Sequence, residues 1–165
     1  SPPPPPPPPP PSPPASPPPP LPPLPPGYVA AATETELRNL IAEAPLGAEV
    51  SIYLPPSAHF KLGSQISCGS NIKVTVASSG EGATLDGQEQ TRLFYLYGGC
   101  SLTLRGLTLV NGRAAGLWPD GLGGVVDAVQ AGDIEIIDSV VRDCYASDKG
   151  GVVYADSSGA VSLTG

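Results

Sequence analysis

A repeated segment in the last third of the chain limits the folds that this sequence can adopt. Gly123-Gly124-Val125-Val126 recurs 27 positions later as Gly150-Gly151-Val152-Val153. Asp133-Ile134-Glu135-Ile136 follows the first copy and residues 159–163 follow the second, with Ile134 and Val161 at the same offset. Apolar and polar residues alternate in each unit before a turn residue, which is strand patterning with one supersecondary unit per repeat. The repeat therefore predicts a coil of a β-solenoid, with the paired glycines forming tight corners.

Short strand-like runs fill the chain after residue 49. Most have three to five residues and are separated by Gly, Ser, Asp or Asn. The runs are Val50–Leu54, Phe60–Leu62 with Ile66, Ile72–Ala77, Ala83–Leu85, Leu93–Tyr97, Leu102–Leu104, Leu107–Val110, Val125–Val129, Ile134–Ile137, Val140–Val141, Val152–Tyr154 and Val161–Leu163. The gaps are too short for crossover helices, so βαβ units are excluded after residue 47. A β-sandwich uses similar short strands and is the alternative.

Equivalent positions along the chain favour the solenoid over the sandwich. Apolar residues recur at steps of 30, 32 and 27 residues, at Ile72, Leu102, Ile134 and Val161. The segment 116–121 is read as a loop insertion, which a solenoid tolerates at its rim. Three short strands per turn predict an all-β fold, a three-faced parallel β-helix over residues 49–165. We expect further coils beyond Gly165.

The first 26 residues have a composition of their own. They hold 20 of the 24 prolines and no charged residue, whereas residues 27–165 hold all 15 acids and all 8 bases. Proline fixes φ near about −65° and lacks a backbone donor, so residues 1–26 are predicted to form a polyproline II rod of about 80 Å. A semi-rigid linker or a disordered tail is the alternative.

Residues 27–48 are predicted to contain an entry segment and a short N-terminal capping helix. Thr33 followed by Glu36 matches a capping box. One helical face then carries apolar residues, at Leu37, Leu40, Ile41 and Ala44. Such a helix would cover the open end of the solenoid core. Residues 29–32 before it are either a short strand or an irregular entry.

The charge of the chain excludes several classes of partner. The net charge is −7, which argues against binding to nucleic acid or to an anionic membrane surface. No run of 18 or more apolar residues occurs, so no membrane span is expected in these residues.

Three cysteines, Cys68, Cys100 and Cys144, are assigned structural roles. They lack the C-x-x-C spacing and the histidine partners of a zinc site, so no metal or other cofactor is expected. At most one pair can form among them. The third either pairs with a coil further along or stays as a small buried residue. Three cysteines in a domain of this size favour an oxidising compartment.

Six aspartates are the candidates for catalysis or calcium binding: Asp86, Asp127, Asp133, Asp138, Asp143 and Asp156. Glycoside hydrolysis needs a pair of carboxyl groups that flank the scissile bond. Asp127 is matched by Tyr154 one repeat later, so two acids do not stack there. The bases Arg105, Arg113 and Arg142 do not sit at matching positions beside acids. The sequence therefore favours turn and surface roles for the aspartates and predicts no enzyme activity.

Other polar and aromatic residues are expected to have turn, surface or packing roles. Asn111 is expected to turn the chain and to hydrogen-bond along the coil. His59 is placed in a loop as a surface or satisfied residue. Trp118 projects from the inserted loop, where it would stack on a sugar or partner or cover the coil as a lid. Alternation at Tyr95 and Tyr97 puts the neighbouring Phe and Leu on the opposite face.

The folded part resembles a known family of β-helices. Asp86-Gly87 after Ala83-Thr84-Leu85, the run from Leu102 to Asn111, and the Gly-Gly-aliphatic steps are similar to the right-handed parallel β-helix of the pectate-lyase-like superfamily, and to the repeats of polymorphic outer-membrane-protein and adhesin-type β-helices. The resemblance covers about residues 33–165. It implies a right-handed coil, and it makes a secreted or wall-tethered polysaccharide lyase or hydrolase an alternative function.

The proline-rich segment resembles another family. Ser1 followed by ten prolines and Ser16 followed by four are similar to the Ser-(Pro)n modules of hydroxyproline-rich glycoproteins, and the fusion of such a rod to a globular domain resembles the wall, matrix and flagellar-appendage glycoproteins of volvocine green algae. The resemblance implies hydroxyprolines carrying arabinose-type glycans, with galactose on serines. No Asn-x-Ser/Thr sequon is present, so any sugar would be O-linked. The implied sites are Ser1, Pro2, Pro3, Pro4, Pro5, Pro6, Pro7, Pro8, Pro9, Pro10, Pro11, Ser12, Pro13, Pro14, Ser16, Pro17, Pro18, Pro19 and Pro20.

The function that these resemblances imply is a structural extracellular glycoprotein of a cell wall, matrix or surface filament. Its expected partners are other copies, other matrix or filament proteins, and glycans. A third hypothesis is an intracellular ligand in which Pro22–Pro25 binds WW, SH3 or profilin-type domains, and it is weakened by the absence of flanking Lys or Arg.

Overall fold

The computed structural model describes residues 1–7, 10, 12–14, 20, 23–116 and 120–165. Their regular secondary structure is mostly strand, with one helix, α1 (Glu34–Ala42). The strands are β1 (Val29–Ala30), β2 (Glu49–Tyr53), β3 (His59–Lys61), β4 (Ile66–Cys68), β5 (Lys73–Ala77), β6 (Ala83–Asp86), β7 (Phe94–Tyr97), β8 (Ser101–Arg105), β9 (Leu107–Val110), β10 (Arg113–Ala114), β11 (Val126–Val129), β12 (Ile134–Ile137), β13 (Val140–Arg142), β14 (Tyr145–Ala146), β15 (Val153–Asp156) and β16 (Val161–Thr164). The all-β class is confirmed.

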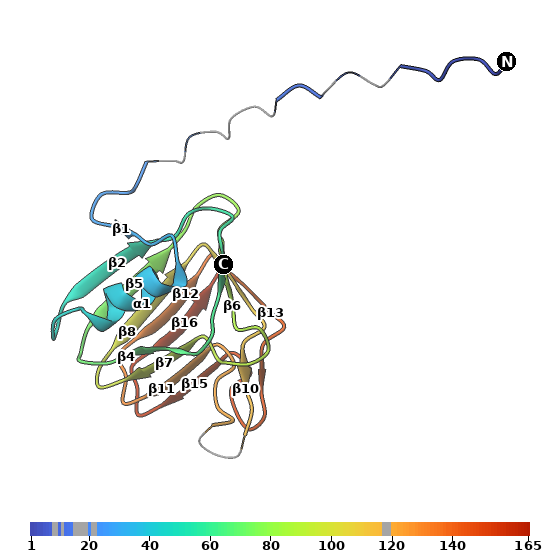
Figure 1. Ribbon diagram of the computed structural model, residues 1–165. Helices are drawn as coiled ribbons and strands as arrows, with labels where there is room; N and C mark the ends of the chain where they lie inside the picture. Colours follow the sequence, from blue (N-terminus) through green and yellow to red (C-terminus); the bar gives the residue numbers. More distant parts are fainter. Residues whose placement is uncertain (8–9, 11, 15–19, 21–22, 117–119) are drawn as a thin grey trace.

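The strands lie in three larger sheets, which we call A, B and C. Sheet A has the order β1-β2-β5-β8-β12-β16, sheet B the order β3-β6-β9-β13, and sheet C the order β4-β7-β11-β15. From β2 onward, successive strands enter A, B and C in rotation, with the short pair β10–β14 lying between B and C in chain order. Every strand pair among the described residues is parallel. This excludes the antiparallel sandwich and confirms the predicted parallel sheets (Figure 1).

Apolar residues stack in register across each sheet and form the core. In sheet A, Leu102 pairs with Ile134, and Ile134 pairs with Val161, as the sequence predicts. The prediction for Ile72 is wrong, because Val74 is the partner of Leu102. Ile72 is buried at the corner before β5, two residues earlier. Because alternate residues of a strand share a face, the apolar pattern does not distinguish these two positions.

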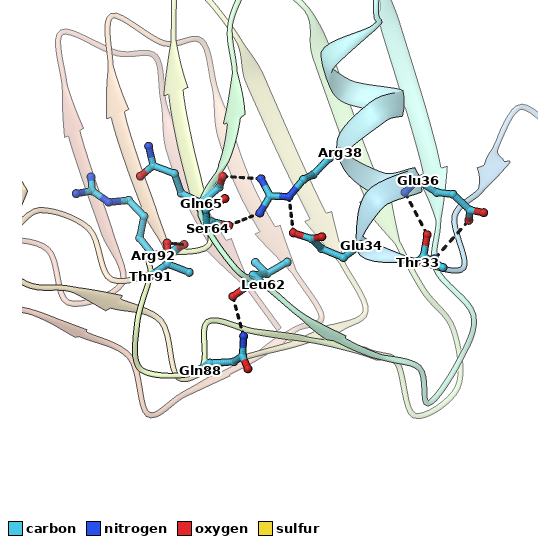
Figure 2. Close-up of polar contacts among 10 residues, drawn as sticks. All are labelled: Thr33, Glu34, Glu36, Arg38, Leu62, Ser64, Gln65, Gln88, Thr91 and Arg92. Atoms are coloured by element: carbon cyan, nitrogen blue, oxygen red, sulfur yellow. Dashed lines mark hydrogen bonds and ion pairs between the residues drawn. The ribbon is translucent and has the colours of Figure 1, made fainter.

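The helix is fixed at both its start and its buried face. Thr33 accepts a hydrogen bond from the Glu36 backbone N–H, and the Glu36 side chain accepts from the Thr33 backbone N–H, so the predicted capping box is present. Leu37 and Ile41 are buried in the same core cluster as the sheets. Arg38 pairs with Glu34 and donates to the carbonyl groups that precede β4 (Figure 2). These contacts hold the helix against the first strands of the sheets.

Three local assignments differ from the sequence prediction or resolve it. Val29–Ala30 form a short strand, β1, and settle the choice left open for residues 29–32. His59 begins β3 instead of lying in a loop. The two-residue strands β10 and β14 were not predicted, because Arg113–Ala114 and Tyr145–Ala146 are too short to show a period of two.

The described residues between Ser1 and Pro26 form no helix or strand, and they are exposed apart from the half-buried Pro25. The polyproline II geometry of this segment stays a prediction. Elsewhere in the part of the chain that the structure describes, no helix is long and apolar enough to cross a membrane.

The first glycine of each repeated pair lies in a tight corner that disfavours a side chain. Gly123 has φ +60° and Gly150 has φ +67°, in the left-handed region that favours glycine. A β-carbon on Gly123 would collide with the carbonyl oxygen of Val126, and one on Gly150 would collide with that of Val153. The same tight corner therefore recurs in both copies, as the repeat predicted.

We expect Gly123→Ala to lower the free energy of unfolding by about 2 kcal/mol. Alanine disfavours the positive φ at this position, and its β-carbon would collide with the Val126 carbonyl oxygen. Urea unfolding followed by circular dichroism measures the change. Gly63→Ala is the matched control, since Gly63 has ordinary φ and open space around its α-carbon. Equal unfolding midpoints for the two variants would show that the corner tolerates a side chain.

Candidate functional site

Asp86 joins three successive strands of sheet B. Its Oδ1 accepts from Asn111 Nδ2 (2.9 Å) and from the Gln88 backbone N–H (2.8 Å), while His59 Nε2 donates to Oδ2 (2.8 Å). His59 lies in β3, Asp86 ends β6, and Asn111 follows β9 with φ +52°. Asn111 therefore both turns the chain and hydrogen-bonds to the neighbouring strand, which confirms its predicted role.

The electrostatics of Asp86 match a structural role. Burial raises the pKa of its carboxyl, but the hydrogen bonds from Asn111, Gln88 and His59 outweigh burial and hold the pKa below its ordinary value. A carboxyl with a lowered pKa in the folded state stabilises the fold above its unfolded pKa, and this contribution is lost as pH falls through the folded pKa. Asp86 is therefore charged and fully engaged at neutral pH.

Asp127 differs from Asp86 because it is buried with an incomplete set of partners. Its side chain is 4% exposed and pairs through Oδ2 with Arg92, whose side chain is 10% exposed. Among the described residues, no donor reaches Oδ1 of Asp127. Burial raises the pKa of Asp127, and the charge and hydrogen bond of Arg92 only partly reverse this, so the pKa lies above its ordinary value.

A cavity of about 350 Å³ lies at this ion pair, which we call the sheet C cavity. Asp127 faces Tyr95 on β7 and Tyr154 on β15 in the register of the sheet, and all three side chains line the cavity. The predicted match between Asp127 and Tyr154 is thus confirmed, and two acids do not stack there. Arg92 also donates to the Asp120 carbonyl (2.7 Å), which fixes its guanidinium at the edge of the cavity.

Sequence reasoning missed Arg92 and Gln65 as members of this site. Gln65 directly precedes β4 and Arg92 lies two residues before β7, so the two occupy neighbouring corners of sheet C. Figure 2 shows their side chains extending to the same side, away from α1. A polar residue just before the strand in successive turns is the sequence signal that could have identified them.

The other candidate acids lie at corners and on the surface. Asp138 (φ +47°) and Asp143 (φ +56°) follow β12 and β13 in left-handed turns, as predicted. Asp133 accepts from the Ala160 backbone N–H (2.8 Å). Asp156 ends β15 and lines the sheet C cavity beside the ion pair. Of the six candidates, the structure therefore brings Asp127 and Asp156 to one cavity.

The cysteines divide into one disulfide and one free thiol. Cys68 and Cys100 form a disulfide that links residues 32 apart. Cys144 is a free, half-buried thiol whose Sγ lies 3.3 Å from the Arg142 carbonyl oxygen. Burial raises the pKa of this thiol, and the nearby Asp143 charge adds to the increase. The sequence left open which two cysteines pair, and the structure resolves it.

The described members of the implied glycosylation sites are exposed: Ser1, Pro2, Pro3, Pro4, Pro5, Pro6, Pro7, Pro10, Ser12, Pro13, Pro14 and Pro20. The others lie outside the described residues: Pro8, Pro9, Pro11, Ser16, Pro17, Pro18 and Pro19. Trp118 also lies outside the described residues. Exposure leaves the described sites open to modifying enzymes.

The polar side chains of the described residues form hydrogen bonds and ion pairs between neighbouring strands. No group of three or more potential metal ligands occurs within them. Comparisons of the chain with family models, with curated proteins and with solved structures find no match.

Proposed function

We propose that sheets A, B and C are the three faces of a right-handed parallel β-helix, capped at its N-terminal end by α1. The rotation of successive strands through the three sheets supports this architecture. The packing of α1 against β2 and β4, with Leu37 and Ile41 inside the shared core, supports the capping role. The polyproline segment is proposed to be a rod attached to this end.

The proposed function is that of a structural extracellular glycoprotein of a wall, matrix or surface filament. The observation that carries it is the use of candidate catalytic groups as cross-strand ties: Asp86 bonds His59 on one side and Asn111 on the other. Such ties make a rigid block suited to assembly. The disulfide Cys68–Cys100 favours an oxidising, extracellular setting. Other copies, matrix proteins and glycans are the proposed partners.

In this proposal the prolines of residues 1–26 are hydroxylated and carry O-linked glycans. Proline in an extended chain has no backbone donor to bury and projects its ring to solvent, so each ring is open to modification. The described sites are exposed, which is consistent with this role. The resulting rod would add length and sugar to the rigid block.

Glycopeptide mass analysis of the native protein tests the proposal. Peptides from residues 1–26 are expected to carry hydroxyl and pentose additions, while peptides from residues 27–165 serve as the internal control and are expected to carry neither. Bare prolines throughout would defeat the glycoprotein hypothesis and favour the intracellular ligand of WW, SH3 or profilin-type domains.

One observation favours the second candidate, a polysaccharide lyase or hydrolase. Asp127 and Asp156 line one cavity together with Arg92. Against it, Asp127 is already bonded to Arg92 and faces tyrosines on both neighbouring strands. Incubation of the protein with pectins and wall glycans, with and without calcium, separates the two candidates. The structural proposal expects no new reducing ends or unsaturated products, and turnover would overturn it.

A further inference from the structure

The outer face of sheet C carries a row of aromatic and acidic side chains that lines the sheet C cavity. Tyr95, Asp127 and Tyr154 are register partners on three adjacent strands, so their side chains form one line across the sheet. Tyr95 also stacks on Tyr97 of the same strand, with ring centroids 5.7 Å apart. Tyr95 and Tyr154 are half-buried, and Tyr97 is 45% exposed. The line therefore presents aromatic rings on either side of a carboxylate.

Asp127 is the residue in this line with an unsatisfied hydrogen-bond acceptor among the described residues. Its residue is 3% exposed, its Oδ2 is bonded to Arg92, and its Oδ1 has no donor among the described residues. A buried carboxylate oxygen without a donor destabilises the fold, because the oxygen has lost water and gained nothing in return. A ligand that enters the sheet C cavity and donates a hydrogen bond to Asp127 would remove this penalty.

The charge of the lining selects the class of donor. Three acidic residues, Asp120, Asp127 and Asp156, line the cavity with one basic residue, Arg92. Arg92 already bonds Asp127 and the Asp120 carbonyl, and neither Asp120 nor Asp156 joins an ion pair within the described ranges. The lining is thus negative overall, and its tyrosine rings attract cations through their faces. The charge of −7 on the whole chain acts in the same direction.

We propose that the sheet C cavity binds the ammonium group of a lysine side chain from a partner protein. The ammonium donates to Asp127 and Asp156 and lies against the ring faces of Tyr95 and Tyr154. A cavity of about 350 Å³ accommodates a single alkylammonium side chain. The site does not depend on sugar being attached to the prolines, so it stands or falls separately from the proposed function.

Nuclear magnetic resonance titration of the full chain tests this site. The probes are N-acetyl-lysine methylamide and n-butylammonium, with n-butanol as the uncharged match. We expect saturable shifts of the Tyr95 and Tyr154 ring resonances with both cations, at a dissociation constant on the order of 1 mM at low ionic strength, and none with n-butanol. Asp156→Asn and Tyr154→Leu are each expected to weaken binding about fivefold.

Asp143→Asn is the control variant, since it removes one exposed charge outside the cavity and is expected to leave the affinity unchanged. Because Asp156 is exposed and Tyr154 half-buried, their variants are expected to fold, and circular dichroism checks this. Equal shifts with n-butanol, equal weakening by Asp143→Asn, or no saturation by either cation would overturn the proposal. Binding of methyl glycosides at the two tyrosines without cation binding would replace it with a saccharide site. Tighter binding of putrescine than of the lysine probe would contradict a protein partner.

Discussion

The double variant Cys68→Ala/Cys100→Ala is expected to lose about 3–4 kcal/mol of unfolding free energy. The disulfide closes a segment of 32 residues, and cross-linking a segment of this length removes conformational freedom from the unfolded chain. Both cysteines are buried, so alanine is preferred to serine because it leaves no hydroxyl without a partner. Urea unfolding without reductant, monitored by circular dichroism, gives the difference.

Two controls separate the disulfide from the loss of a cysteine side chain. Cys144→Ala removes the free thiol and is expected to lower the unfolding free energy by less than about 1.5 kcal/mol. Reductant is expected to lower the stability of the unmodified protein and to leave the double variant unchanged. Should the double variant fail to fold, the effect of reductant on the unmodified protein still measures the bond. An unmodified protein that is insensitive to reductant, with the bond shown by mass to be reduced, would contradict the prediction.

The parallel sheets are predictable from the sequence because equivalent positions of successive units are neighbours in the sheets. Leu102, Ile134 and Val161 were placed at one position in successive units, and the structure pairs them in register. The error at Ile72 has a physical origin. Ile72 and Val74 are both buried on the same side of the chain, so alternation alone leaves the register uncertain by two residues.

The candidate site is harder to predict because two of its residues, Gln65 and Arg92, lie in the corners that precede strands, where apolar and polar residues do not alternate regularly. Asp127 was recognised as a position without a stacked acid, and its partners Tyr95 and Tyr154 follow from the register. Arg92 lies before β7, in a segment whose path in space the alternation does not set. It meets Asp127, 35 residues further along the chain, because β7 and β11 are neighbouring strands of sheet C.

Arg92→Met is expected to destabilise the fold by about 3–5 kcal/mol at neutral pH. The substitution keeps much of the side-chain volume but leaves the Asp127 carboxylate buried without its counter-charge. Adding Asp127→Leu to this variant is expected to restore most of the loss, because an apolar pair needs no partner in a buried site. Arg142→Met is the matched control, and its exposed pair with Asp143 is expected to contribute less than about 0.5 kcal/mol.

The pH dependence distinguishes a lost ion pair from lost packing. The pKa of Asp127 already lies above its ordinary value through burial, and removing the Arg92 charge raises it further. As pH falls through this raised pKa, the folded variant takes up a proton that the unfolded chain does not bind until about pH 4. The deficit of Arg92→Met is therefore largest at neutral pH and shrinks on acidification, whereas a deficit from packing alone would be the same at each pH. Urea unfolding of the single and double variants at several pH values distinguishes the loss of charge from the loss of packing. A double variant as unstable as Arg92→Met would show that Arg92 stabilises the fold through packing and not through its charge.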